Sequence, residues 1–75
     1  MCLTDVKRGQ EVCITCIDDE GLRTQLIRFG IAEGSRIRCL EKIPLGPCMI
    51  RHNRQELAFG RDVARKIRVR QGTAL

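Results

Sequence analysis

Aromatic residues are almost missing from this 75-residue sequence, which has no Trp, no Tyr and only two Phe, Phe29 and Phe59. The local pattern predicts core positions for both. A groove for proline-rich peptides is lined by aromatic side chains, and proteins that bind single-stranded nucleic acid stack bases on such side chains. The sequence therefore disfavours both activities.

Residues that carry catalysis are also scarce, since Ser35 is the only serine and no carboxylate pair accompanies a histidine. Gly30 and Gly34 are not followed by the Lys-Ser or Lys-Thr pair of a phosphate-binding loop, so they indicate a helix end and a turn. An arginine inserted in trans beside another protein's nucleotide stays physically possible, with Arg23 or Arg28 as candidates. We expect no catalytic residue and no enzyme activity.

Long apolar segments are absent, because no stretch approaches the roughly 20 apolar residues that span a bilayer. Residues 1–5 lack the basic region and apolar run of a secretory signal. The five cysteines are an odd number, which suits reduced thiols better than a disulfide framework. Eleven Arg and three Lys give a net charge of +5, which favours anionic partners. We expect a cytoplasmic protein.

Cys13 and Cys16 form the one pattern that suggests metal or redox chemistry. In a strand, positions i and i+3 point to opposite faces, so the two sulfurs would not converge on one ion. A tetrahedral site would also need Cys39 or Cys48, and His52 is the only histidine. We interpret the pair as small apolar filling residues and expect no metal and no cofactor. Metal held between two chains by these cysteines stays undecided.

Alternating apolar residues and Gly/Pro breaks predict five short strands, one helix and one helical turn. The predicted strands span residues 11–17, 36–43, 48–51, 56–59 and 67–70. The first strand has two apolar faces and should be central. In the second, Ile37 and Cys39 should face the core, with Glu41 or Ile43 continuing that face.

The predicted helix follows the first strand, with Leu22, Leu26 and Phe29 on its apolar side. Acidic residues 18–20 suit its N-terminus, and Gly30 suits its end. So short a helix is unstable alone and must pack on the strands. A small mainly-β closed barrel follows, because closure removes sheet edges. We expect one domain over residues 1–75, with 71–75 as a frayed tail.

The helix, two turns and the closing strand carry a recognisable pattern: Arg23-x-x-Leu26-x-x-x-Gly30-Ile31-x-x-Gly34, Pro44-Leu45-Gly46 and Ile67-x-Val69. From about Leu3 to Val69 the chain resembles the ferrous-iron-transport protein A (FeoA) family. The resemblance implies an SH3-like five-stranded barrel with one inserted helix and a short helical turn before the last strand. Cys13-x-x-Cys16 departs from the family pattern.

The resemblance also implies a cytosolic accessory protein of a membrane ferrous-iron permease that carries a GTP-binding cytosolic domain. We expect no small-molecule substrate. We expect partner contact through Pro44, Leu45 and Gly46, which family analogy puts on the helix-bearing side of the barrel, and through the helix face around Arg23 and Arg28. The protein would then be free in the cytoplasm or at the inner membrane through its partner, and weak self-association stays open.

The alternative is a nucleic-acid-binding or repressor-type barrel, because the same fold forms the C-terminal domain of iron- and manganese-dependent repressors, which the chain resembles locally. Basic residues at the C-terminal end could bind duplex phosphates, with a steep dependence on salt. These residues are Arg61, Arg65, Arg68 and Arg70. Nucleic acid is the less favoured partner of the two.

Overall fold

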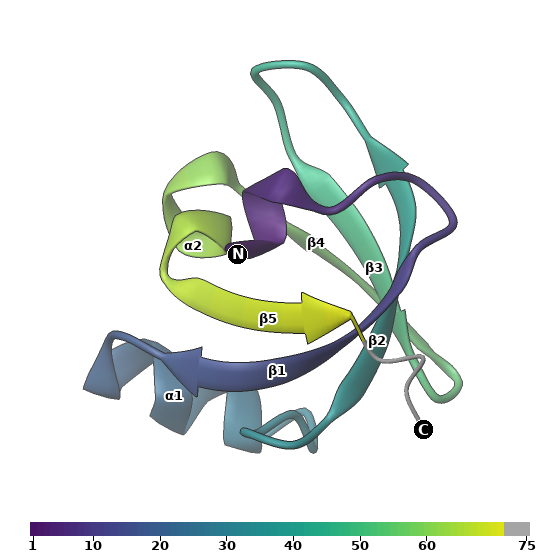
Figure 1. Ribbon diagram of the computed structural model, residues 1–75. Helices are drawn as coiled ribbons and strands as arrows, with labels where there is room; N and C mark the ends of the chain where they lie inside the picture. Colours follow the sequence, from purple (N-terminus) through teal and green to yellow (C-terminus); the bar gives the residue numbers. More distant parts are fainter. Residues whose placement is uncertain (72–75) are drawn as a thin grey trace.

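The computed structural model, which describes residues 1–71, contains one strongly curved antiparallel sheet that wraps around the core (Figure 1). Its strand order is β4-β3-β2-β1-β5. The strands are β1 (Glu11–Ile17), β2 (Arg36–Lys42), β3 (Cys48–His52), β4 (Gln55–Phe59) and β5 (Ile67–Gln71). The helical elements are η1 (Leu3–Asp5), α1 (Glu20–Ile27) and α2 (Arg61–Arg65). The predicted small mainly-β fold, with a helix after the first strand and a helical turn before the last, is confirmed.

Strand β1 is in the interior of the sheet, as predicted, because it pairs with β2 on one side and β5 on the other, and it contains a bulge. Its register against β5 shifts between Ile14 and Cys16. Because one extra residue interrupts the alternation, both Ile14 and Ile17 are buried. Cys13 and Cys16 are therefore on the same outer face, opposite the exposed Arg70 and Arg68. The prediction of opposite faces for this pair is wrong.

A second irregularity lies in β2, whose register against β3 shifts between Cys39 and Glu41. Ile37 and Cys39 are buried as predicted, but Glu41 is exposed and Ile43 is 47% exposed. The predicted continuation of the core face through Glu41 or Ile43 is wrong, because the shift turns the end of β2 outward.

The start of α1 is fixed by Asp19, whose carboxylate accepts a hydrogen bond of 2.9 Å from the Leu22 backbone N–H. This bond satisfies one of the unpaired N–H groups at the helix start. It also holds the pKa of Asp19 below its usual value, with Lys66 at 3.1 Å adding to the effect. The predicted acidic helix N-terminus is confirmed.

The end of α1 is a glycine-dependent cap. Gly30 N–H donates to the Ile27 carbonyl at 2.9 Å, and Ile31 N–H donates to the Leu26 carbonyl at 3.0 Å. Gly30 has a φ of +78°, which only glycine adopts without strain. Leu26 and Ile31 enter the core, but Phe29 is 47% exposed. Its predicted core position is wrong because the helix ends before it.

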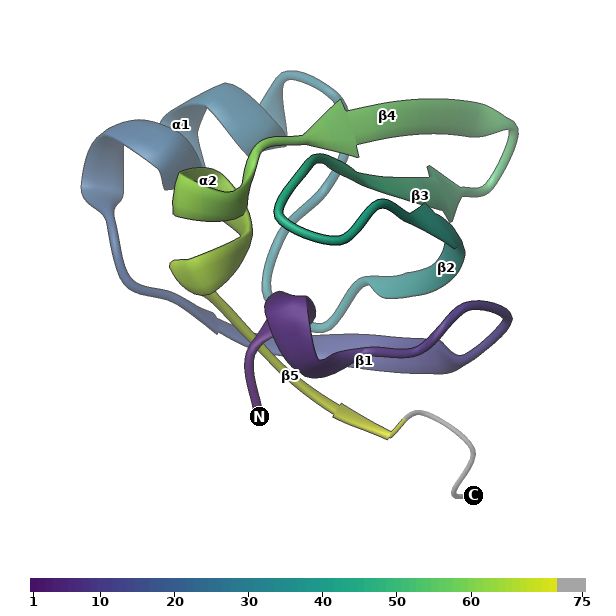
Figure 2. The same ribbon diagram turned by 90° about the horizontal axis from the view of Figure 1, so that it is seen from above.

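The core contains only apolar side chains among the described residues. It includes Leu3 and Val6, so the N-terminal segment is part of the barrel and η1 lies against α2 (Figure 2). Val69 N–H donates to the Met1 carbonyl at 2.7 Å, which covers the edge of β5. Gln71 ends β5, so the predicted tail starts too early, and residues 72–75 lie outside the described part.

Neither helix within residues 1–71 has the length and apolar character needed to span a bilayer.

Candidate partner-binding surface

The connection between β2 and β3 places Leu45 at the tip of a rigid turn, where its side chain is 84% exposed. Gly46 N–H donates to the Ile43 carbonyl at 2.8 Å and closes the turn. Leu45 has a φ of +60° and follows Pro44, the arrangement of a type II turn, in which glycine or asparagine is usual at the second central position. The predicted exposure of Leu45 at the tip is confirmed, and its backbone is strained.

Two neighbouring residues keep this turn in place. A Cβ on Gly46 would lie only 2.9 Å from Ile43 Cγ2, so no side chain fits there without a shift. Pro44 fixes its own φ and so limits the alternatives open to the turn. A left-handed non-glycine residue costs about 1–2 kcal/mol. In the isolated protein, an exposed leucine buries too little apolar surface to offset this cost. Strained backbone is concentrated at functional sites.

A cleft of about 230 Å³ separates this turn from η1 and α2, with Thr4, Arg61 and Ala64 among its lining residues. The Lys42 ammonium group bridges it by donating to the Thr4 carbonyl. In Figure 1 the turn and α1 are at opposite ends of the barrel. The helical elements beside Leu45 are therefore η1 and α2. The prediction that the turn lies beside the inserted helix α1 is wrong.

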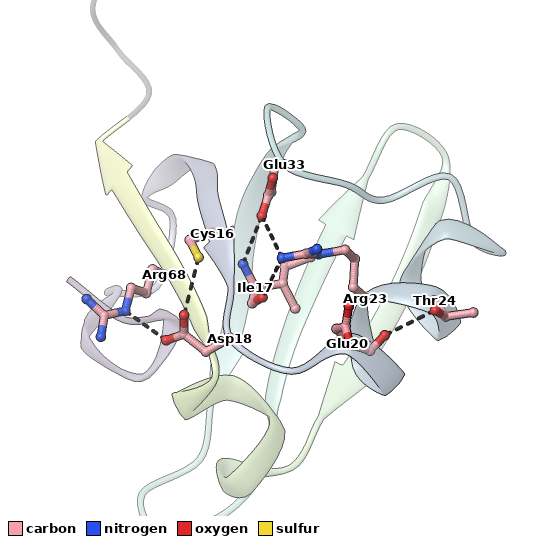
Figure 3. Close-up of polar contacts among 8 residues, drawn as sticks. All are labelled: Cys16, Ile17, Asp18, Glu20, Arg23, Thr24, Glu33 and Arg68. Atoms are coloured by element: carbon pink, nitrogen blue, oxygen red, sulfur yellow. Dashed lines mark hydrogen bonds and ion pairs between the residues drawn. The ribbon is translucent and has the colours of Figure 1, made fainter.

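Arg23 connects α1 to the body of the barrel (Figure 3). Its Nη2 donates to the Ile17 carbonyl at 3.1 Å and to Glu33 Oε2 at 3.3 Å, and the same Glu33 oxygen accepts from Ile17 N–H at 3.4 Å. One nitrogen of this guanidinium thus makes internal contacts, while the side chain as a whole is 42% exposed. Arg28 is exposed and forms no ion pair within residues 1–71. Of the two predicted contact arginines, Arg28 is the one free to meet a partner.

Cys16 is tied to a local polar network rather than to a second sulfur (Figure 3). Its thiol donates to Asp18 Oδ1 at 3.2 Å, which raises the pKa of Cys16. Arg68 Nε donates to Asp18 Oδ2 at 2.8 Å and holds the pKa of Asp18 below its usual value. No three His, Cys, Asp or Glu side chains within residues 1–71 gather as metal ligands.

Cys39 and Cys48 form a buried pair between β2 and β3, with their sulfurs 4.0 Å apart. Burial raises the pKa of Cys48 to about 11, and Cys39 adds to the effect. Thiols that stay protonated are weak nucleophiles and weak ligands. This pair fills the core.

The basic C-terminal end has fewer unpaired positive charges than its sequence indicates. Arg65 pairs with Asp62 at 2.5 Å and Arg68 pairs with Asp18 at 2.8 Å. Only Arg61 and Arg70 of the four predicted arginines form no ion pair within residues 1–71. The end offers fewer uncompensated charges for duplex phosphates than expected.

The fold and these surfaces define a small SH3-like barrel in which the most exposed large apolar residue of the described part, Leu45, is held on a strained turn. An FeoA domain family model matches residues 1–71. The crystal structure of an iron uptake regulatory protein (FeoA) is 27% identical, with a TM-score of 0.82 and 93% of each chain covered. A search of curated proteins finds no match. The chain belongs to the FeoA family.

Two further structures are more distant. FeoA of Stenotrophomonas maltophilia complexed with zinc, described as a procaryotic SH3 domain protein, is 17% identical, with a TM-score of 0.80 and 93% of this chain and 89% of that chain covered. ScaR with bound Zn²⁺ is 23% identical, with a TM-score of 0.82 over 95% of this chain but only 36% of that chain. These likenesses show the fold alone. The FeoA family is linked to ferrous-iron transport rather than to enzyme activity, and this does not favour the repressor alternative.

Proposed function

We propose that the protein is a non-catalytic accessory of ferrous-iron uptake that binds the GTP-binding cytosolic domain of a membrane ferrous-iron permease. The observation that carries the proposal is Leu45, an 84% exposed leucine in a left-handed conformation on a proline turn. Family membership supplies the iron-transport setting. The protein would work in the cytoplasm and reach the inner membrane through this partner.

The turn is suited to docking because it is ordered before binding. The hydrogen bond from Gly46 to Ile43 and the ring of Pro44 already hold the backbone, so little conformational entropy is lost on association. Full burial of a leucine side chain contributes about 1.5–3 kcal/mol. The partner would therefore present an apolar pocket to Leu45, and this contact alone is worth about tenfold to a hundredfold in affinity.

The helix contributes a second, separate contact, because α1 and the proline turn are at opposite ends of the barrel (Figure 1). Arg28 is the exposed candidate there, and it is also the arginine that could reach a bound nucleotide in trans. Arg23 supports this contact by holding α1 to Ile17 and Glu33. Partner binding would thus depend mainly on Leu45, with a smaller contribution from Arg28.

The test is association with the purified cytosolic domain of the permease, measured by interferometry with and without GTP. Leu45→Asp should weaken binding at least about tenfold while circular dichroism shows an intact fold. The matched control is Ala58→Asp, which places the same charge on an exposed apolar residue of β4, outside both proposed contacts. Unchanged binding of Leu45→Asp, or a larger loss with Ala58→Asp, would remove the turn from the proposal. GTP hydrolysis by wild type and Arg28→Ala tests the arginine.

A further inference from the structure

The outer face of β2 and β3 carries three arginines in register. Arg36 and Arg38 are two positions apart on β2, and both are exposed beside buried Ile37. Arg51 of β3 is directly opposite Arg38. Like charges in facing positions destabilise a sheet, so this arrangement is unfavourable in the isolated protein.

Two carboxylates flank the arginine cluster (Arg36, Arg38 and Arg51), but no arginine of the cluster forms an ion pair within residues 1–71. Glu11 of β1 is opposite Arg38 in the sheet, and Glu56 of β4 is opposite Arg51. Neither acid forms an ion pair with an arginine of the cluster. The three guanidinium groups are thus left without an ion pair, unlike Arg68 of β5, which is paired with Asp18.

The cluster surrounds a cleft of about 420 Å³, lined by Glu11, Arg36, Ile37, Arg38, Arg51 and Asn53. Arg51 is held at its edge because its Nε donates to the Asn53 carbonyl at 3.2 Å, and Asn53 itself has a φ of +58°. The lining residues, three arginines and one glutamate, carry a net charge of +2, and Glu56 opposite Arg51 is not among them. The remaining N–H groups of the guanidinium forks are free to bind oxygens of one anion.

We infer that this cleft binds a phosphate group. A phosphate monoester carries about −1.5 to −2 charges at pH 7, which matches the charge of the cleft, and its oxygens suit bidentate arginine contacts. The residues named for contact with the permease are elsewhere, so the two sites stand or fall separately. The phosphate group could belong to a small soluble molecule or to a lipid headgroup, and both sources present the same chemistry.

The protein can be titrated with sodium pyrophosphate in one arm and with vesicles of phosphatidylcholine containing about a third phosphatidic acid, whose headgroup is a phosphate monoester, in the other, against pure phosphatidylcholine. Backbone amide shifts by NMR should move at β2 and at Arg51–Asn53, and binding should weaken as salt rises. A response to pyrophosphate identifies a soluble source, and a response to anionic vesicles alone identifies a lipid source.

Variants that change the charge of the cleft in both directions test its assignment. Arg38→Gln should weaken binding about fivefold or more, and Glu11→Gln should tighten it. Arg61→Gln removes the same charge outside the cleft and should change little. Absence of binding in both arms, association with duplex DNA alone, or equal effects of Arg38→Gln and Arg61→Gln would overturn the inference.

Discussion

Leu45→Asn should stabilise the isolated protein even though it removes a large apolar side chain. A φ of +60° is strained for leucine, whereas asparagine adopts this region several times more often. That preference corresponds to a gain of about 0.6–1 kcal/mol. Leucine at 84% exposure gives up little burial, about 0.2–0.5 kcal/mol. The net expectation is a small gain of a few tenths of a kcal/mol.

Leu45→Val provides the opposite change, because a β-branched side chain tolerates positive φ least. This variant should lose about 1 kcal/mol, or roughly 4–8 °C in Tm for a domain of this size. Thermal unfolding followed by circular dichroism, with urea unfolding as a second measure, would rank the variants as Asn, then Leu, then Val. A Tm for Leu45→Asn well below wild type, or a Tm for Leu45→Val equal to wild type, would refute the left-handed backbone in solution.

The structure contains its own control for this argument. Asn53 has a φ of +58°, almost the conformation of Leu45, in the turn between β3 and β4. Asn53→Leu should therefore destabilise the protein by about the amount that Leu45→Asn gains from the backbone. Leu45→Asn should also weaken binding to the permease domain. A substitution that raises stability and lowers affinity would support strain retained for docking.

Three further outcomes are expected. The hydrogen bond from the Leu22 N–H lowers the pKa of Asp19. This carboxylate therefore stabilises the fold above its unfolded pKa of 3.8, and the stabilisation is lost as the pH falls further. At low pH the urea midpoint of Asp19→Asn should therefore fall less than that of the wild type. At pH 7.5, an aromatic disulfide reagent should label three of the five cysteines in the folded protein, with Cys39 and Cys48 reacting only on unfolding. In Gly30→Ala the added Cβ meets no other atom, but the φ of +78° is strained for alanine. The Tm should therefore drop by the equivalent of about 1 kcal/mol.

The order of strands, helix and turns could be predicted from the sequence because each depends on local spacing. Val12, Ile14 and Ile17 belong to an apolar segment, and Gly30 and Gly34 mark places where φ is positive. Local patterns of this kind can be recognised in the sequence without knowing which strands pair. The number, type and sequence of elements were therefore predictable.

The bulges were not predictable in the same way. A bulge exists only relative to a paired strand, so nothing in residues 11–17 alone shows that the register against β5 shifts. That shift decides which face Cys13 and Cys16 share, and the shift in β2 decides that Ile43 leaves the core. The core role of Leu3 has a similar cause, since η1 is too short to show a periodic pattern.

In the candidate surface, too, local features could be predicted from the sequence and features that depend on packing could not. Exposure of Leu45 followed from two prolines and a glycine around it, which is local chemistry. The internal role of Arg23 depends on Glu33, which is brought close only when α1 packs against β1. The arginine cluster depends on register, because Arg38 and Arg51 are 13 positions apart in sequence and meet only across the sheet.

The two proposed sites should be energetically independent, because they occupy opposite ends of one hairpin. Lys42 is four positions beyond Arg38 on β2, about 13 Å at 3.3 Å per residue, and Leu45 is further along the chain. Substitutions more than about 7–10 Å apart usually add within a few tenths of a kcal/mol. The double variant Leu45→Asp/Arg38→Gln should therefore show the permease affinity of the first change and the phosphate affinity of the second. A measured coupling above about 0.5 kcal/mol would mean that β2 and β3 transmit binding at one end to the other, and saturating pyrophosphate should then change the permease affinity of the wild type.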